Sequence, residues 1–179
     1  MWHSLPMKSR FAAAVAAAWL GTLGVASAGP AEDLKEAQKL QASGKLAQAL
    51  EKVEAVLLAQ PRDPQARFLK GVLLTDQKQP AEATKVFQAL TQDYPELPEP
   101  WNNLAVLYAA QGEYDKARTA LEVAISTHPG YSTAHENLGD IYAQMAGRSY
   151  DRALQLDKNN TTARAKLATV KDLVQPPKK

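Results

Sequence analysis

The chain contains no cysteine among its 179 residues. Disulfide bonds are therefore excluded, as is the cysteine on which bacterial lipoproteins carry their lipid. The fold must be held together by packing alone, and 179 residues suffice for one domain with a sizeable core or for a short array of repeats.

A strong excess of one charge is also absent, because the formal net charge is only +2. Proteins that bind nucleic acid or a membrane surface carry a concentrated basic patch, and the basic residues here are dispersed. The sequence therefore predicts neither a nucleic-acid partner nor a membrane-surface partner.

Clustered catalytic residues are missing as well. Outside the N-terminal segment the chain has two histidines, His128 and His135, and neither stands in a metal-binding spacing. There is no G-x-S-x-G sequence and no glycine-rich phosphate loop, and the acidic residues are scattered along the chain, many of them beside basic ones. We predict no enzymatic activity, no cofactor and no metal site.

The chain has one long uncharged run, and it lies near the N-terminus. Lys8 and Arg10 precede the run Phe11–Val25, and the small-residue site Ala26-Ser27-Ala28 follows it. This order is typical of a secretory signal peptide, so we predict cleavage after Ala28, with a retained membrane anchor as the alternative. Removal of residues 1–28 leaves 19 basic and 19 acidic residues and no predicted membrane span.

The rest of the chain repeats itself every 34 residues. Small residues recur at Ala49, Ala83 and Ala117, and prolines recur at Pro61, Pro95 and Pro129. The unit over residues 98–131 is the best formed, with Trp101, Leu104, Ala105 and Tyr108 on one helical face, then Gly112, then Ala117 and Leu121 on a second. Each unit therefore reads as a helix, a turn and a second helix.

This period and these columns resemble the tetratricopeptide repeat, W-x2-L-G-x2-Y followed by A-x3-F and P. The resemblance implies an all-α solenoid of antiparallel helix pairs over residues 29–175. Small residues at Gly71, Ala105 and Gly139 are expected where the two helices of a unit cross closely. The predicted repeats span about 30–63, 64–97, 98–131 and 132–160, a capping helix spans 161–174, and 176–179 form a flexible tail.

The fourth unit departs from the pattern after Tyr142. About five residues are missing where the turn and the start of the second helix belong. Either the second helix is short, or one fused helix runs from Thr133 to Leu156, and Gly147 favours a break. The first helix of unit 1 is also unusual, because Asp33 and Glu36 replace apolar residues, which suits either an end of the array that faces water or a frayed start.

The concave surface is where repeats of this kind contact partners, because the first helix of each pair lines it. The predicted inner residues that form the candidate binding groove are Leu34, Gln38, Phe68, Val72, Asn102, Val106, Glu136 and Asp140. Phe68 and Val72 either bind a partner or pack on a neighbouring helix. One subclass of the family clamps a peptide carboxylate with basic residues and asparagines, but Glu99 stands where a lysine is wanted, so that function is disfavoured.

The resulting hypothesis is a scaffold that binds a peptide or protein segment in this groove, in the periplasm after export. It is similar to small tetratricopeptide proteins of the bacterial cell envelope. Two alternatives remain open at this point: a self-associating array, which makes the protein a homo-oligomer, and the docking module of a larger envelope enzyme.

Overall fold

The computed structural model describes residues 29–173, and within them every regular element is an α-helix. The predicted all-helical solenoid is thus confirmed, whereas the predicted signal peptide, the end of the capping helix and the tail fall outside the described residues. The helices are α1 (Pro30–Ala42), α2 (Leu46–Ala59), α3 (Pro64–Asp76), α4 (Pro80–Asp93), α5 (Pro98–Ala110), α6 (Tyr114–Thr127), α7 (Ser132–Leu156) and α8 (Thr161–Leu173).

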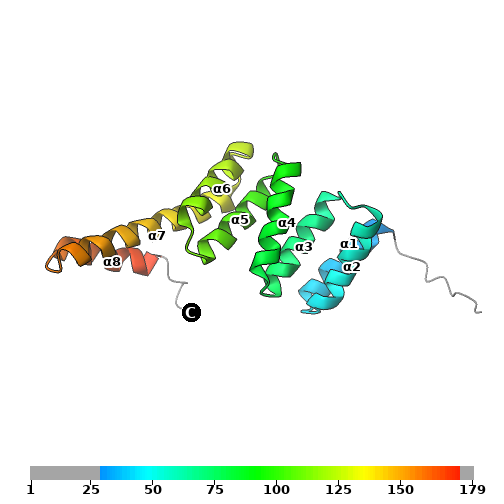
Figure 1. The fold of residues 1–179 in the computed structure, drawn as a ribbon, viewed down its shortest axis with the longest axis horizontal. Helices are drawn as coiled ribbons and strands as arrows, with labels where there is room; N and C mark the ends of the chain where they lie inside the picture. The colour runs from blue at the N-terminus through cyan, green and yellow to red at the C-terminus, as the bar shows by residue number, and fades with distance from the viewer. Residues whose placement is uncertain (1–28, 174–179) are drawn as a thin grey trace, which may run out of the picture.

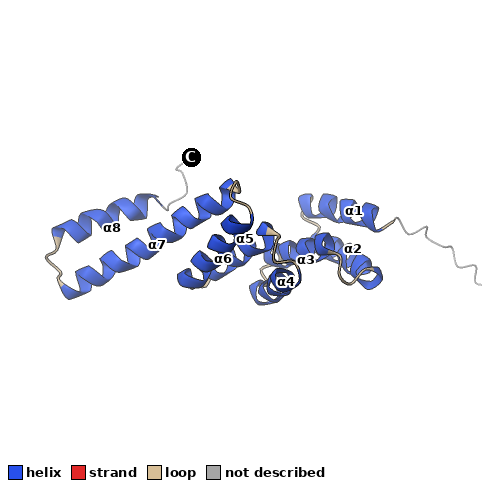
Figure 2. Cartoon of the chain, turned by 90° about the horizontal axis from the view of Figure 1, so that it is seen from above, coloured by secondary structure: helices blue, strands red, loops and turns tan. Residues whose placement is uncertain are grey.

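The helices pack in chain order, each against the next, and they form an elongated row (Figure 1). The first helices of neighbouring units also touch, α1 against α3 and α5 against α7. Seen from above, α1 and α8 lie on one side of the row and α4 and α6 on the other (Figure 2). This arrangement buries two apolar clusters, one within units 1 and 2 and a larger one from unit 2 to the start of α7.

The same turn joins the two helices in each of the first three units. Gly44 and Gly112 each have a φ of +75°, and Lys78 occupies the equivalent position with a φ of +61°. The left-handed conformation suits glycine, but it crowds the Cβ of any other residue. Lys78 is therefore the strained member of a repeated turn.

Replacement of Lys78 by glycine is expected to raise the free energy of unfolding by about 0.5–1 kcal/mol, because relief of left-handed strain exceeds the entropy that glycine loses. Urea unfolding followed by circular dichroism measures the change. The matched control is Gly44→Ala, whose added Cβ meets no atom within 4 Å, so only the backbone conformation is altered. The free energy of unfolding of Gly44→Ala should fall by about 1 kcal/mol. A rise would contradict the conclusion that the left-handed conformation strains a residue with a Cβ.

Side chains as well as core packing join the two helices within units 1 and 2. At the start of α1, Asp33 is buried and accepts a hydrogen bond of 2.9 Å from Lys52 of α2. This hydrogen bond raises the pKa of Lys52. The expectation that the polar first turn of α1 faces water is therefore wrong for Asp33, because the α2 lysine supplies its partner.

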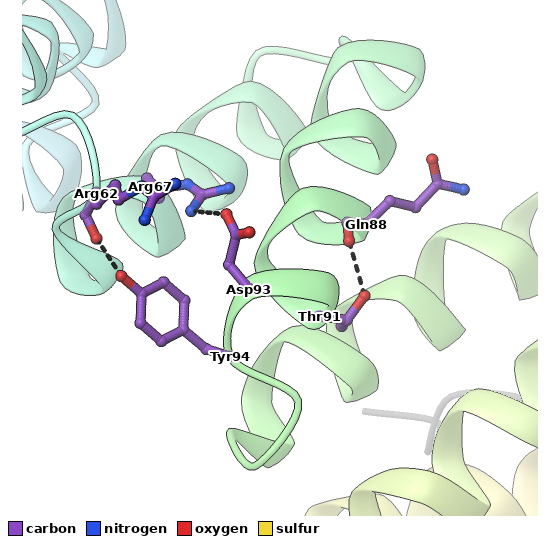
Figure 3. A network of polar contacts seen from close by, with 6 residues as sticks. All are labelled: Arg62, Arg67, Gln88, Thr91, Asp93 and Tyr94. Atoms are coloured by element: carbon purple, nitrogen blue, oxygen red, sulfur yellow. Dashed lines mark hydrogen bonds and ion pairs between the residues drawn. The ribbon is translucent and has the colours of Figure 1, made fainter.

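A second polar network lies at the end of unit 2 (Figure 3). Arg67 of α3 binds Asp93 of α4 at 2.6 Å, and the Tyr94 hydroxyl donates to the carbonyl of Arg62 at 2.6 Å. Thr91 is buried and donates to the carbonyl of Gln88 at 2.9 Å. The contacts of Asp93 and Tyr94 tie the end of α4 to the start of α3 and to the loop before it, whereas the Thr91 hydrogen bond stays within α4.

The fourth unit is one continuous helix of 25 residues, α7, so the fused alternative is the one observed. Gly147 does not break it, contrary to the expectation from sequence. Helix α8 packs beside it, and a Cβ there would lie 3.6 Å from Val170 and 4.0 Å from Leu167, which are ordinary contact distances, so this packing does not require glycine. Without residues for a turn, the chain continues as helix and α8 packs along its second half.

The fused helix also changes the role of Gly139. A Cβ at Gly71 would lie 2.6 Å from the Phe87 ring, as expected where two helices cross closely. A Cβ at Gly139 would meet no atom within 4 Å. The prediction of a close crossing at Gly139 is wrong, because the helix that would cross there is absent from the fourth unit.

Candidate functional site

The concave side of units 1 to 3 holds a pocket with a volume of about 660 Å³. Helices α1 and α3 form two of its walls, and the start of α5 with the residue before it forms the third. The lining residues are Leu34, Gln38, Gln41, Pro64, Gln65, Phe68, Leu69, Val72, Leu97, Glu99 and Pro100. Such a mostly apolar concavity with a few polar groups is the usual form of a binding site.

Four of the eight predicted groove residues meet in this pocket: Leu34 and Gln38 from α1, and Phe68 and Val72 from α3. They meet because successive first helices stand side by side and each presents every third or fourth residue to the inner side. Gln38 is exposed, while the other three are half-buried and available from the groove.

Phe68 has two contacts at once. One edge of its ring packs on the core, with its centroid 5.7 Å from that of Phe87 and the planes tilted by 60°. The remaining surface lines the pocket. Val72 likewise lines the pocket, and both residues also pack against the larger core cluster. Phe68 and Val72 are therefore packing residues on one side and candidate binding residues on the other.

Asn102 differs from the expectation. It is 6% exposed, and its Oδ1 accepts a hydrogen bond of 2.7 Å from Nδ2 of Asn137 on α7. A buried amide that is already paired does not face a ligand, so Asn102 joins units 3 and 4. The sequence placed Asn102 on the inner face but did not show that Asn137 of the next unit reaches it.

The remaining three predicted residues lie along α5 and α7, outside this pocket. Val106 is 47% exposed, and Glu136 and Asp140 are exposed. Among the described residues, no ion pair involves Glu136, Asp140 or the pocket residue Glu99. The inner side therefore carries negative charge from the pocket toward α7.

The pKa of Tyr131, just before α7, responds to this negative charge. Partial burial raises the pKa of its phenol, and the negative charge of Glu99 raises the same pKa further. The charge of Glu99 therefore acts on a group at the junction of units 3 and 4, although burial is the larger cause. A cation bound near Glu99 would find a carboxylate that no described basic residue neutralises.

Sequence reasoning missed several lining residues. Pro64 and Gln65 begin α3, and Leu97 and Glu99 stand at the entry of α5. The repeat register contained the signal for Gln65 and Glu99, since both occupy the second position of their units. Leu97 precedes its helix, so only the folded chain shows that it reaches the pocket.

Trp101 packs within the array. It is half-buried against the larger core cluster, and its indole nitrogen donates to the carbonyl of Pro95 at 3.1 Å. No group of three or more metal-binding side chains occurs within residues 29–173. In the same range, no helix combines the length and the apolar character needed to span a membrane.

Comparison with solved structures shows the fold. The first tetratricopeptide domain of Spaghetti (RPAP3), bound to an HSP90 peptide SRMEEVD, matches 65% of this chain and 93% of that one, with a TM-score of 0.61 and 15% identity. A thermophilic tetratricopeptide protein of Thermus thermophilus matches 79% of this chain and 80% of that one, with a TM-score of 0.60 and 22% identity.

Among curated proteins, a chloroplastic protein of Arabidopsis thaliana named tetratricopeptide repeat domain-containing protein PYG7 is 32% identical over 117 residues. The match covers 60% of this chain but 39% of that protein, so the chain spans less than half of its relative's length. Two family models described as tetratricopeptide repeat match residues 34–98 and 74–138, which together exceed half of the chain. The chain therefore belongs to the tetratricopeptide repeat family.

Proposed function

We propose that this protein is a scaffold that binds an extended segment of a partner protein in its concave groove, with the pocket at Phe68 as the anchor. The observation that carries the proposal is this apolar pocket of about 660 Å³, built from three successive units and open to the groove. A solved relative of the same fold is bound to a peptide, which supports this mode of binding.

The chemistry of the groove favours a particular kind of segment. Phe68, Val72 and Leu34 offer apolar contact to one bulky side chain. Glu99 at the pocket, and Glu136 and Asp140 further along, favour lysine or arginine beside that anchor. The peptide bound to the solved relative has two consecutive glutamates and an aspartate, and we expect this groove to repel such a peptide.

Fluorescence polarisation with two labelled peptides tests the proposal. Both are seven residues long with a central phenylalanine, and two flanking residues are lysines in one peptide and glutamates in the other. The lysine peptide should bind more tightly, and its preference should weaken with salt because the contacts are exposed. Equal binding of the two peptides would contradict the charge assignment, and binding of neither would remove the pocket as an anchor.

Two variants separate the apolar and charged contributions. Phe68→Ala should weaken the lysine peptide about tenfold, the effect of losing one well-packed aromatic contact. Glu99→Lys should weaken the same peptide about two- to fivefold and improve the glutamate peptide, as expected for an exposed charge pair. The control is Leu58→Ala, on the 86% exposed side chain of α2, which should change neither affinity.

We also propose that the protein acts in the cell envelope after export, because the sequence of residues 1–28 predicts a secretory signal peptide. Intact-mass measurement of the protein from a Gram-negative host, after release of the periplasmic fraction, should give a chain beginning at Gly29. A full-length chain in the membrane fraction would favour the retained anchor.

A further inference from the structure

One face of α7 lacks the cover that its equivalents have. In unit 2 the small residue Gly71 lies under the Phe87 ring of α4. In unit 4 the equivalent Gly139 has open space in place of a second helix, and Tyr142 is 50% exposed. The face that a second helix covers in the other repeats is open here.

This open face runs the length of α7 with a regular spacing. The residues on it are His135, Gly139, Tyr142, Ala146, Ser149, Ala153 and Leu156, separated alternately by four and three positions. A four–three spacing keeps side chains on one side of a helix and matches them to a second helix. None of the seven is fully buried, and Leu156 is 74% exposed.

The neighbours of α7 within the chain use other faces. Gly147 lies against Val170 and Leu167 of α8, while Ala134 and Ile141 belong to the core cluster shared with α5 and α6. The face of Gly139 and Tyr142 lies between these two contacts. A further helix can therefore approach it without displacing either neighbour.

We propose that this face binds the same face of a second copy, with the two α7 helices antiparallel. In that alignment Gly139 lies opposite Leu156 of the second copy, Tyr142 opposite its Ala153, and Ala146 opposite its Ser149. Each of the first two layers sets a large side chain against a small one, which is how helices interdigitate closely. A parallel alignment would set Tyr142 against Tyr142 and Gly139 against Gly139, leaving a clash beside a gap.

The size of the contact limits its strength. The face from His135 to Leu156 is roughly 31 Å long at 1.5 Å per residue. Two helices in contact over that length bury on the order of 1,000 Å² in total, at the lower end for specific protein interfaces. The dimer is therefore weak and concentration-dependent, and sedimentation velocity should show monomer in dilute samples and dimer in concentrated ones.

Because the chain has no cysteine, engineered cysteines give an unambiguous test. The variant Gly139→Cys with Leu156→Cys, treated with a short bismaleimide cross-linker, should give a covalent dimer on a denaturing gel. Neither single variant should, because like positions lie roughly 25 Å apart along antiparallel helices. A control pairs Gly139→Cys with Ala165→Cys on the exposed surface of α8 and should stay monomeric.

Every other outcome overturns the proposal. Linkage by Gly139→Cys alone would mean parallel helices, and linkage of the α8 control would mean random collision. Absence of a covalent dimer from the double variant would exclude this face, whether sedimentation finds a monomer or a dimer. In a second measurement Tyr142→Arg, on an exposed side chain, should abolish the dimer while leaving the circular dichroism and the binding of the lysine peptide unchanged.

Discussion

Replacement of Phe87 by alanine is expected to lower the free energy of unfolding by about 3–5 kcal/mol, as large an effect as a single core truncation usually has. The Phe87 side chain is fully buried in the larger core cluster. It touches Gly71 of its own unit and lies beside Phe68 of the groove. Its loss removes apolar burial and leaves a cavity between α3 and α4.

Urea unfolding followed by circular dichroism measures this loss. The dependence of the free energy of unfolding on urea concentration is compared between the variants. Leu58→Ala is the control, because its 86% exposed side chain makes a change within about 0.5 kcal/mol expected. A loss below about 1 kcal/mol for Phe87→Ala would show that the site collapses and that Phe87 does not hold the two helices in place. The same variant should also weaken the lysine peptide, since Phe68 loses the ring that supports it.

Replacement of Gly71 by alanine is expected to cost about 1–3 kcal/mol, the usual effect of overpacking a core. The added Cβ would lie 2.6 and 2.7 Å from two atoms of the Phe87 ring. The ring is fully buried and cannot swing away without moving its neighbours. The two helices must therefore separate slightly.

The same substitution at Gly147 should have the opposite sign. A Cβ there would meet Val170 at 3.6 Å, an ordinary contact, and alanine favours a helix interior by about 0.5–1 kcal/mol over glycine. A double variant gives a further check. Phe87→Leu removes the ring atoms that crowd Gly71, so Gly71→Ala should cost less in that background, and an unchanged cost would place the strain elsewhere.

The repeat itself was predictable from the sequence because its signals are local. Helix periodicity, the prolines that begin α3, α4 and α5, and the glycines of the turns all act within a few residues of their positions. The inner positions followed from the same register. Leu34, Gln38, Phe68 and Val72 were therefore predictable from the repeat alone, and the pocket that unites them required only that first helices stack.

Features that depend on two distant segments were decided by the tertiary structure. Asn102 is buried because Asn137 of the next unit reaches it, and Asp33 is buried because Lys52 of α2 pairs with it. Neither partner is distinguished in the sequence from any other asparagine or lysine on a helix. Burial at these positions is the result of how the helices meet.

The fused helix α7 shows the same division most clearly. The sequence by itself determined that about five residues are missing from the fourth unit, and it left a short helix and a fused helix as alternatives. The choice between them depended on two free energies: the cost of placing Gly147 inside a helix, and the stabilisation that α8 gains by packing against that helix. Because Leu167 and Val170 of α8 lie against Gly147, tertiary packing outweighs a local preference of about 1 kcal/mol, and the helix continues.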